Sequence, residues 1–172
     1  MADIWTVTET GSDARGNPMM LVAAVSALVA AYSAQETGAP MAFVTIDGDC
    51  TRASVLGDDV TRLCRGPLVN TTFTNGRSNF LLQLNGLAAL SFSGAGNLQV
   101  RDGDNVTQPI DRVIIIYDES PHEPAITAAV GQCRFGNPYK GPIVVRCTAE
   151  TGAGLIEATF RSDGSEPTVA EF

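Results

Sequence analysis

Short apolar runs separated by turn signals dominate the chain after Pro40, and they limit its fold more than any other feature. The runs are rich in Val, Ile, Phe, Thr and Leu, and turn-forming residues interrupt them about every eight to twelve positions, which is typical of strands. The expected strands cover residues 41–46, 68–74, 78–84, 88–93, 97–101, 106–110, 112–117, 142–148 and 155–160. About eight such strands predict a mainly β fold, a single antiparallel β-sandwich or barrel-like domain.

The residues between these runs predict tight turns. Asn75-Gly76 is a two-residue hairpin signal, and the strings Asp47-Gly48-Asp49 and Asp102-Gly103-Asp104 suit turns because glycine adopts positive φ without steric cost. The same carboxylates could bind calcium, but neither string continues into the spacing of a calcium loop, which favours the turn interpretation. Residues 125–132 fit a strand or a helix.

A hydrophobic segment near the N-terminus predicts export. Residues 19–34 read MMLVAAVSALVAAYSA, and no charged residue occurs from Gly16 to Gln35. An apolar stretch of about fifteen residues matches a secretory signal and is short for a bilayer span of about twenty. Ala31 and Ser33 are the small residues expected before cleavage at Ala34. We therefore expect residues 1–33 to be a leader with a hydrophobic, signal-like helix, followed by a β domain over residues 34–172.

Several alternatives for this segment stay open. The acidic, polar stretch 1–18 is long for the start of a signal peptide, so translation could begin at Met19 or Met20. The segment could also remain as a membrane anchor or form a buried helix of a soluble protein. The Arg15-Gly16 junction resembles a prepilin cleavage site, and this resemblance implies a subunit of a surface appendage. Gly38 and Pro40, however, end the apolar helix earlier than in pilins.

Four cysteines at two equal spacings predict two disulfides. Cys50 and Cys64 are 14 positions apart, and so are Cys133 and Cys147. Four cysteines allow three pairings, and the equal spacings favour Cys50–Cys64 and Cys133–Cys147. Structural zinc sites use close Cys-x-x-Cys pairs, usually with histidines. This chain has no Cys-x-x-Cys pair and a single histidine, which favours disulfides over zinc. Disulfides persist in oxidising compartments, so we expect a periplasmic or secreted protein.

Composition and charge exclude some partners. The apolar fraction of 44% and the charged fraction of 17% in 172 residues indicate a packed globular domain. The formal net charge is −8, and Lys140 is the only lysine. No basic stripe is present to bind nucleic acid, and an anionic membrane would repel the chain. The acidic charge is compatible with a protein partner. We expect no stable membrane insertion once the leader is cleaved.

The loop enclosed by the second cysteine pair is the candidate binding site. It reads FGNPYKGP, and we select Phe135, Asn137, Tyr139 and Lys140 as candidate binding residues. A disulfide would fix the tip of this loop, and tyrosine on a rigid loop supplies contact area at low entropic cost. The structural alternative is that Asn-Pro and Gly-Pro only shape a turn while the two aromatic rings cover the edge of the core.

Catalytic signatures are absent from the sequence. It contains no nucleophile elbow, P-loop, metalloprotease helix or dinucleotide-binding motif. The single histidine, His122, lies in an acidic loop from Asp118 to Glu123, which could serve a hydrolase or could be a solvated connection. We therefore expect no catalytic residue, metal or cofactor. The leading hypothesis is a non-enzymatic exported domain with a binding or structural role in the cell envelope or the extracellular space. The alternatives are an appendage subunit and a hydrolase that uses the acidic loop.

Overall fold

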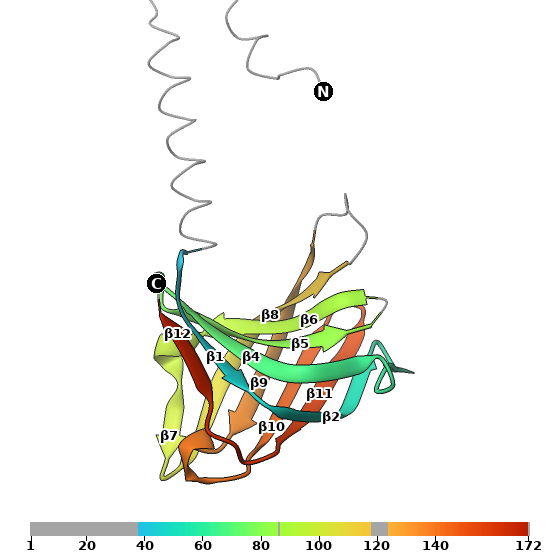
Figure 1. Ribbon diagram of the computed structural model, residues 1–172. Helices are drawn as coiled ribbons and strands as arrows, with labels where there is room; N and C mark the ends of the chain where they lie inside the picture. The colour runs from blue at the N-terminus through green and yellow to red at the C-terminus, as the bar shows by residue number, and fades with distance from the viewer. Residues whose placement is uncertain (1–37, 86, 118–123, 172) are drawn as a thin grey trace, which may run out of the picture. The chain divides into compact units, whose positions relative to one another are not determined.

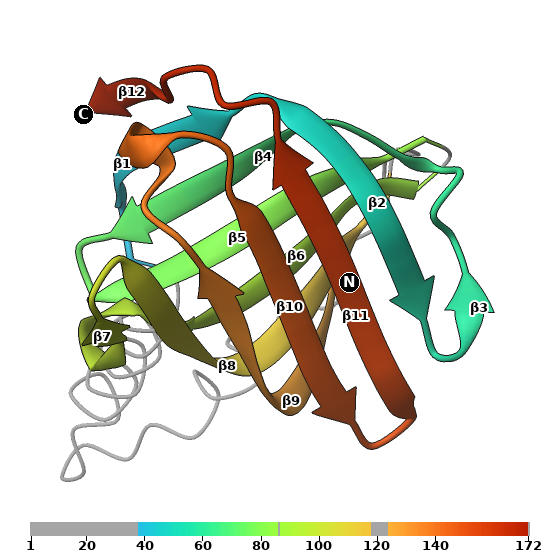
Figure 2. The same cartoon turned by 90° about the horizontal axis from the view of Figure 1, so that it is seen from below.

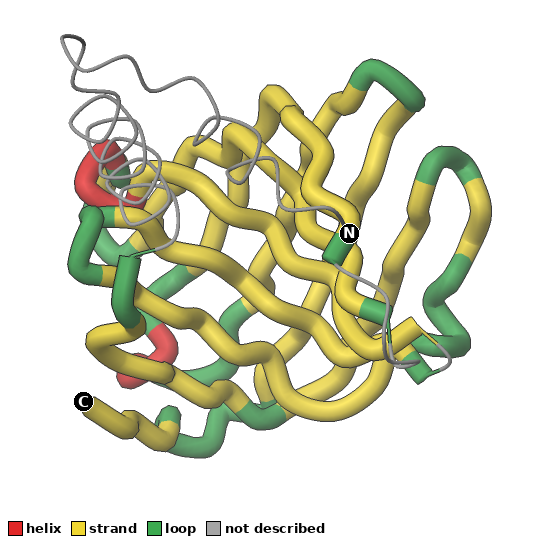
Figure 3. Tube along the Cα trace, turned by 90° about the horizontal axis from the view of Figure 1, so that it is seen from above, coloured by secondary structure: helices red, strands yellow, loops and turns green. Residues whose placement is uncertain are grey.

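The computed structural model describes residues 38–85, 87–117 and 124–171, which fold mainly into strands (Figures 1 and 3). The strands are β1 (Pro40–Ile46), β2 (Gly48–Val55), β3 (Asp58–Asp59), β4 (Cys64–Phe73), β5 (Arg77–Leu84), β6 (Leu87–Ala95), β7 (Val100–Asp102), β8 (Asn105–Ile116), β9 (Ala125–Phe135), β10 (Val144–Thr151), β11 (Gly154–Ser162) and β12 (Thr168–Glu171). Two 3-10 turns, η2 (Gly96–Leu98) and η3 (Pro138–Lys140), complete the described elements. The prediction of a mainly β fold is confirmed.

All these strands belong to one antiparallel sheet that curls into a half-barrel (Figure 2). The strand order is β12-β1-β4-β5-β6-β8-β9-β10-β11-β2-β3, and β7 pairs with β8 outside this path. Most neighbours in the sheet are also neighbours in the sequence, because short turns connect antiparallel strands directly. One continuous curled sheet therefore replaces the two packed sheets of a sandwich.

Two of the three predicted turns are hairpin turns. Asn75-Gly76 connects β4 to β5, and Asp102-Gly103-Asp104 connects β7 to β8. Gly76 has φ 78° and Gly103 has φ 59°, which are values that glycine adopts without a steric penalty. Both segments thus form the tight turns that their sequences predict.

The prediction of a tight turn at Asp47-Gly48-Asp49 is wrong. Only Asp47 separates β1 from β2, and these strands do not pair with each other. β1 pairs with β4 and β12, whereas β2 pairs with β11 and β3. A Cβ atom on Gly48 would lie 2.1 Å from the carbonyl oxygen of Arg161, so this close strand contact requires glycine. The segment is a corner at which the chain changes its strand partners.

Several predicted strand boundaries differ from the observed ones. Residues 106–110 and 112–117 were expected as two strands but belong to one strand, β8, whose register shifts between Ile110 and Arg112. Residues 125–132, ambiguous in the sequence, are part of β9. The expected strand 97–101 is mostly the turn η2, followed by the short β7.

The concave face of the sheet forms the core. Its largest fully buried side chains include those of Phe80, Phe92, Phe160 and Leu90. The polar side chain of Gln108 is also fully buried, and two hydrogen bonds satisfy its amide. Gln99 Nε2 donates to Gln108 Oε1 at 2.7 Å, and Gln108 Nε2 donates to the carbonyl oxygen of Ser78 at 3.0 Å. Paired in this way, an amide is tolerated in an apolar interior.

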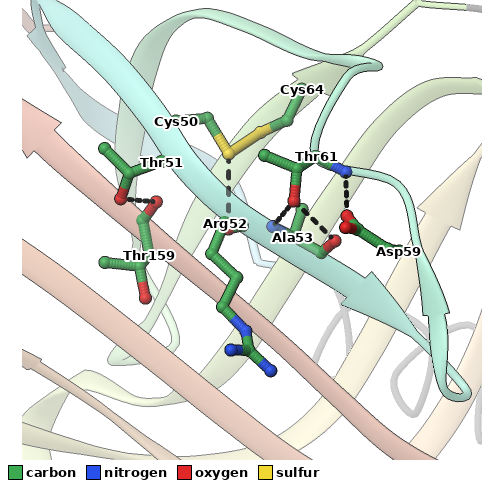
Figure 4. Close-up of a disulfide and its surroundings, with 8 residues drawn as sticks. All are labelled: Cys50, Thr51, Arg52, Ala53, Asp59, Thr61, Cys64 and Thr159. Atoms are coloured by element: carbon green, nitrogen blue, oxygen red, sulfur yellow. Dashed lines mark hydrogen bonds between the residues drawn. A yellow bond between two sulfur atoms is a disulfide. The ribbon is translucent and has the colours of Figure 1, made fainter.

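Both predicted disulfides are present. Cys50–Cys64 joins β2 to β4, two strands that contact each other without pairing in the sheet (Figure 4). Thr61, in the connection between β3 and β4, supports the same seam because its hydroxyl accepts from Ala53 N at 3.0 Å and donates to Ala53 O at 3.2 Å (Figure 4). Cys133–Cys147 joins directly opposed residues of β9 and β10. One disulfide therefore holds the curl together, and the other reinforces a hairpin.

The predicted N-terminal helix and its cleavage site lie outside the described residues. Within residues 38–85, 87–117 and 124–171, no helix has the length and hydropathy needed to cross a membrane.

Candidate functional site

The loop between β9 and β10 contains three of the four candidate binding residues and folds as a capped turn, and the fourth, Phe135, is the last residue of β9. Asn137 precedes η3, and its side-chain Oδ1 accepts from the backbone N of Tyr139 at 3.0 Å. Pro138 follows at the first position of the turn, where its missing N–H costs no hydrogen bond. Local side-chain chemistry therefore fixes the conformation of the tip, as the Asn-Pro sequence suggests.

The base of this loop is held on both sides. The Cys133–Cys147 disulfide closes it, and both cysteines are buried in the core. On the return side, Ile143 N donates to Ser162 Oγ at 2.8 Å, and Ser162 N donates to Ile143 O at 3.0 Å. The loop thus leaves and re-enters the sheet through buried, bonded residues, which limits its conformational freedom.

The candidate residues have different surroundings. Phe135 is half-buried, and its ring lies 5.0 Å from that of Phe80, centroid to centroid, at the edge of the core. Tyr139 is 57% exposed. The structural alternative thus describes Phe135 well, whereas Tyr139 is presented to solvent. Tyrosine with an exposed ring on a fixed turn is typical of contact residues in binding loops.

The hairpin of β7 and β8 forms the other side of the site. Lys140 Nζ lies 2.7 Å from Asp104 Oδ1, and this ion pair connects the loop to the hairpin turn. Between the two lies a cavity of about 350 Å³, lined by Arg101 and Gly103 of the hairpin and by Asn137 and Tyr139 of the loop. Asp104 of the hairpin is 36 positions from Lys140 in sequence, and no local motif connects the two segments.

A second cavity, of about 470 Å³, adjoins the first and shares three lining residues, Val106, Phe135 and Gly136. Its polar lining comes from four strands on the convex face of the sheet: Asp102, Asn105, Thr107, Arg134 and Arg146. Neither arginine is among the candidate binding residues predicted from the sequence. The sequence does contain an indication of this arrangement, because Arg134 follows Cys133 and Arg146 precedes Cys147. If the two cysteines are opposed in a hairpin, the two arginines are the next opposed pair.

The structure adds no geometry for the other candidate sites that the sequence suggested. The acidic loop from Asp118 to Glu123, including His122, lies outside the described residues. In the described part of the chain, no group of three or more His, Cys, Asp or Glu side chains is arranged to hold a metal ion. Asp102 and Asp104 flank a hairpin turn, and Asp104 pairs with Lys140.

A charge cluster on the convex face serves the fold. Arg77 donates from both terminal nitrogens to Asp111, at 2.9 and 2.6 Å, and Arg112 Nε lies 3.0 Å from Asp111 Oδ1. Hydrogen bonds from Arg77, and secondarily from Arg112, hold the pKa of Asp111 below its ordinary value of 3.8. The cluster bridges β5 and β8 across β6, next to the register shift in β8.

This cluster predicts a pH-dependent contribution to stability. We expect Asp111→Asn to lower the free energy of unfolding by about 1 kcal/mol at neutral pH, a small value because the carboxylate is half-exposed. Because the folded-state pKa is lowered, the stabilisation is present above pH 3.8 and is lost as the pH falls through the folded value. Urea unfolding between pH 2 and pH 7 measures the difference. Asp58→Asn, which removes an exposed carboxylate without an ion pair among the described residues, is the control. A deficit that persists unchanged at the lowest pH would contradict the assignment.

Comparisons of the chain with protein-family models, with curated proteins and with solved structures found no match.

Proposed function

We propose that this chain is an exported, disulfide-bonded domain with a non-enzymatic binding role in the cell envelope or the extracellular space. It binds a protein partner through the turn from Asn137 to Lys140. The observation that carries this proposal is an exposed tyrosine, Tyr139, on a turn fixed by a disulfide, a side-chain cap and an ion pair. Preorganisation of this kind lowers the entropic cost of association.

Two features support the proposed location. Both disulfides are of a kind that persists in oxidising compartments and is rare in the cytosol. The apolar residues 19–34 have the length of a secretory signal. An exported protein meets its partners outside the cytosol, so the partner is sought in the periplasm or the medium.

Site-specific photo-crosslinking in the producing cell tests the proposal. A photoreactive phenylalanine analogue replaces Tyr139 in one variant and Leu155 in another. Leu155, at the start of β11, is 44% exposed and lies near the β10–β11 turn. This turn is at the opposite end of β10 from η3, so Leu155 is an exposed control position away from the proposed surface. We expect a cross-linked product of defined mass from position 139 that is absent from position 155 and reduced by Lys140→Ala. Equal products at both positions, or no product at 139, would contradict the proposed surface. A cross-link to a second copy of the chain would favour the appendage-subunit alternative instead.

A further inference from the structure

Two arginines face each other on the convex side of the β9–β10 hairpin. Cys133 pairs with Cys147 in the sheet register, and the next pair towards the loop is Arg134 with Arg146. Since successive side chains of a strand alternate between faces, the buried disulfide places both arginines on the outer face, where they are exposed. Directly opposed Cβ atoms in a sheet lie about 5 Å apart. The two guanidinium groups therefore start from adjacent positions.

In the described part of the chain, neither arginine forms an ion pair with a carboxylate. Four other basic side chains have acidic partners within ion-pair distance: Arg52 with Glu157, Arg77 and Arg112 with Asp111, and Lys140 with Asp104. Among the described residues, no carboxylate lies within 4.0 Å of Arg134 or Arg146. The side-chain amide oxygen of Gln132, in the amide orientation that satisfies both residues, accepts from Arg134 Nη2 and Nε at 3.2 and 3.3 Å. Like charges directly opposite each other destabilise a sheet, so the opposed arginines repel each other.

The pair lines a cavity whose size suits a small ligand. Its volume is about 470 Å³, within the range of about 300–1,000 Å³ that is usual for small-molecule sites. Thr107 is the sheet partner of Arg134 on the next strand, and Asn105 lies two positions further along, so a hydroxyl and an amide can supply neutral donors. Asp102, the one carboxylate in the lining, is the sheet partner of Asn105.

We propose that Arg134 and Arg146 form a binding site for a phosphate group carried by a small molecule or present as free phosphate. Each guanidinium is a planar fork of donors that can bind two oxygens of an oxyanion. A carboxylate has two oxygens and is satisfied by one fork, whereas a phosphate has more oxygens and carries about −1.5 to −2 charges at neutral pH, which matches two arginines. Such a ligand neutralises the opposed charges. The site does not depend on the protein-binding turn proposed above.

Calorimetric titration of the natively produced full chain tests the site, at constant ionic strength. The probes are inorganic phosphate, glycerol 1-phosphate and acetate, and the variants are Arg134→Gln, Arg146→Gln and the control Arg65→Gln. Arg65 is a suitable control because it is exposed, flanks the other disulfide at Cys64 and has no acidic partner among the described residues. We expect one saturable phosphate site per chain, weakened about tenfold to a hundredfold by either change at the pair. The control should bind within about twofold of the unmodified chain, since a distant charge acts weakly.

The possible results distinguish the two sources of the phosphate, and some of them would overturn the proposal. Tighter binding of glycerol 1-phosphate identifies a phosphomonoester as the ligand class, and tighter or equal binding of inorganic phosphate identifies free phosphate. Phosphate should raise the melting temperature of the unmodified chain and of Arg65→Gln but not that of Arg146→Gln. Absence of saturable binding, an equal loss in Arg65→Gln, or acetate binding as tight as phosphate would overturn the proposal. None of these results depends on cross-linking at Tyr139.

Discussion

Replacing Cys133 and Cys147 together by alanine is expected to lower the free energy of unfolding by about 3 kcal/mol or more. The sequence separation is 14, and closing a loop of this size restricts the unfolded chain by about that amount. Both cysteines are also buried, at 0% and 2% exposure, so alanine leaves small voids in the core. β9 and β10 keep their backbone hydrogen bonds, so the variant should fold with the native topology and lose stability.

The other disulfide provides the matched control for this experiment. Cys50 and Cys64 have the same separation of 14, so their loop-closure contribution is the same. They join β2 to β4, which have no hydrogen-bonded pairing, so their loss should open the seam locally and increase amide exchange in β2 and β3. Urea unfolding and hydrogen exchange measure the two effects, and intact mass before and after reduction verifies each bond. Unchanged stability in the Cys133 and Cys147 variant would show that the hairpin alone fixes this part of the sheet.

The two disulfides also show what cysteine spacing can and cannot predict. Equal spacing correctly favoured local pairing, because a short intervening segment makes the two thiols meet often. It gave no information on whether the joined strands pair in the sheet. Cys133 and Cys147 are opposed in one hairpin, whereas Cys50 and Cys64 cross a seam, and only the full strand order distinguishes these cases. For the same reason, the Arg134 and Arg146 pair could be found only once the hairpin register was known.

Strands with alternating apolar residues were predictable, and strands defined by their neighbours were not. Residues 78–84 and 155–160 match β5 and β11 closely, because their buried positions alternate. β2 reads GDCTRASV, a polar sequence that becomes a strand because β11 pairs along it. All four residues of β12 are exposed, and the strand is formed by pairing with β1 at the edge of the sheet. Tertiary context decides such segments, and local propensity does not.

The candidate loop was predictable from local chemistry, and its surroundings were not. The Asn-Pro turn and the flanking cysteines identified the loop, and the cap from Asn137 to Tyr139 N explains its conformation. Asp104, which pairs with Lys140, lies 36 positions away in sequence. No local motif connects residues so far apart, and the β7–β8 hairpin lies beside the loop because β8 pairs with β9 in a register that places Val106 opposite Phe135.

Truncating Phe92 to alanine is expected to lower the free energy of unfolding by about 3–5 kcal/mol. Phe92 is fully buried near the middle of β6, and its sheet partners are Phe80 on β5 and Val113 on β8, both also buried. The curl of the sheet surrounds the ring with side chains from several strands, so the cavity cannot collapse easily. This cost is a large fraction of the stability of a typical domain, about 5–15 kcal/mol.

The position of β6 makes Phe92 a sharper test than other core residues. β6 is buried on both faces, because the small side chains of Ser91 and Ser93 on its convex face are covered as well. The measured loss therefore reports on packing around a strand near the middle of the curled sheet. Val130→Ala, at an 81% exposed position, should change the stability by less than about 0.5 kcal/mol and is the control. Urea unfolding of both variants measures the difference. A loss near 1 kcal/mol for Phe92→Ala would mean that the interior can close around the missing ring, and that the concave face is less tightly packed than its burial indicates.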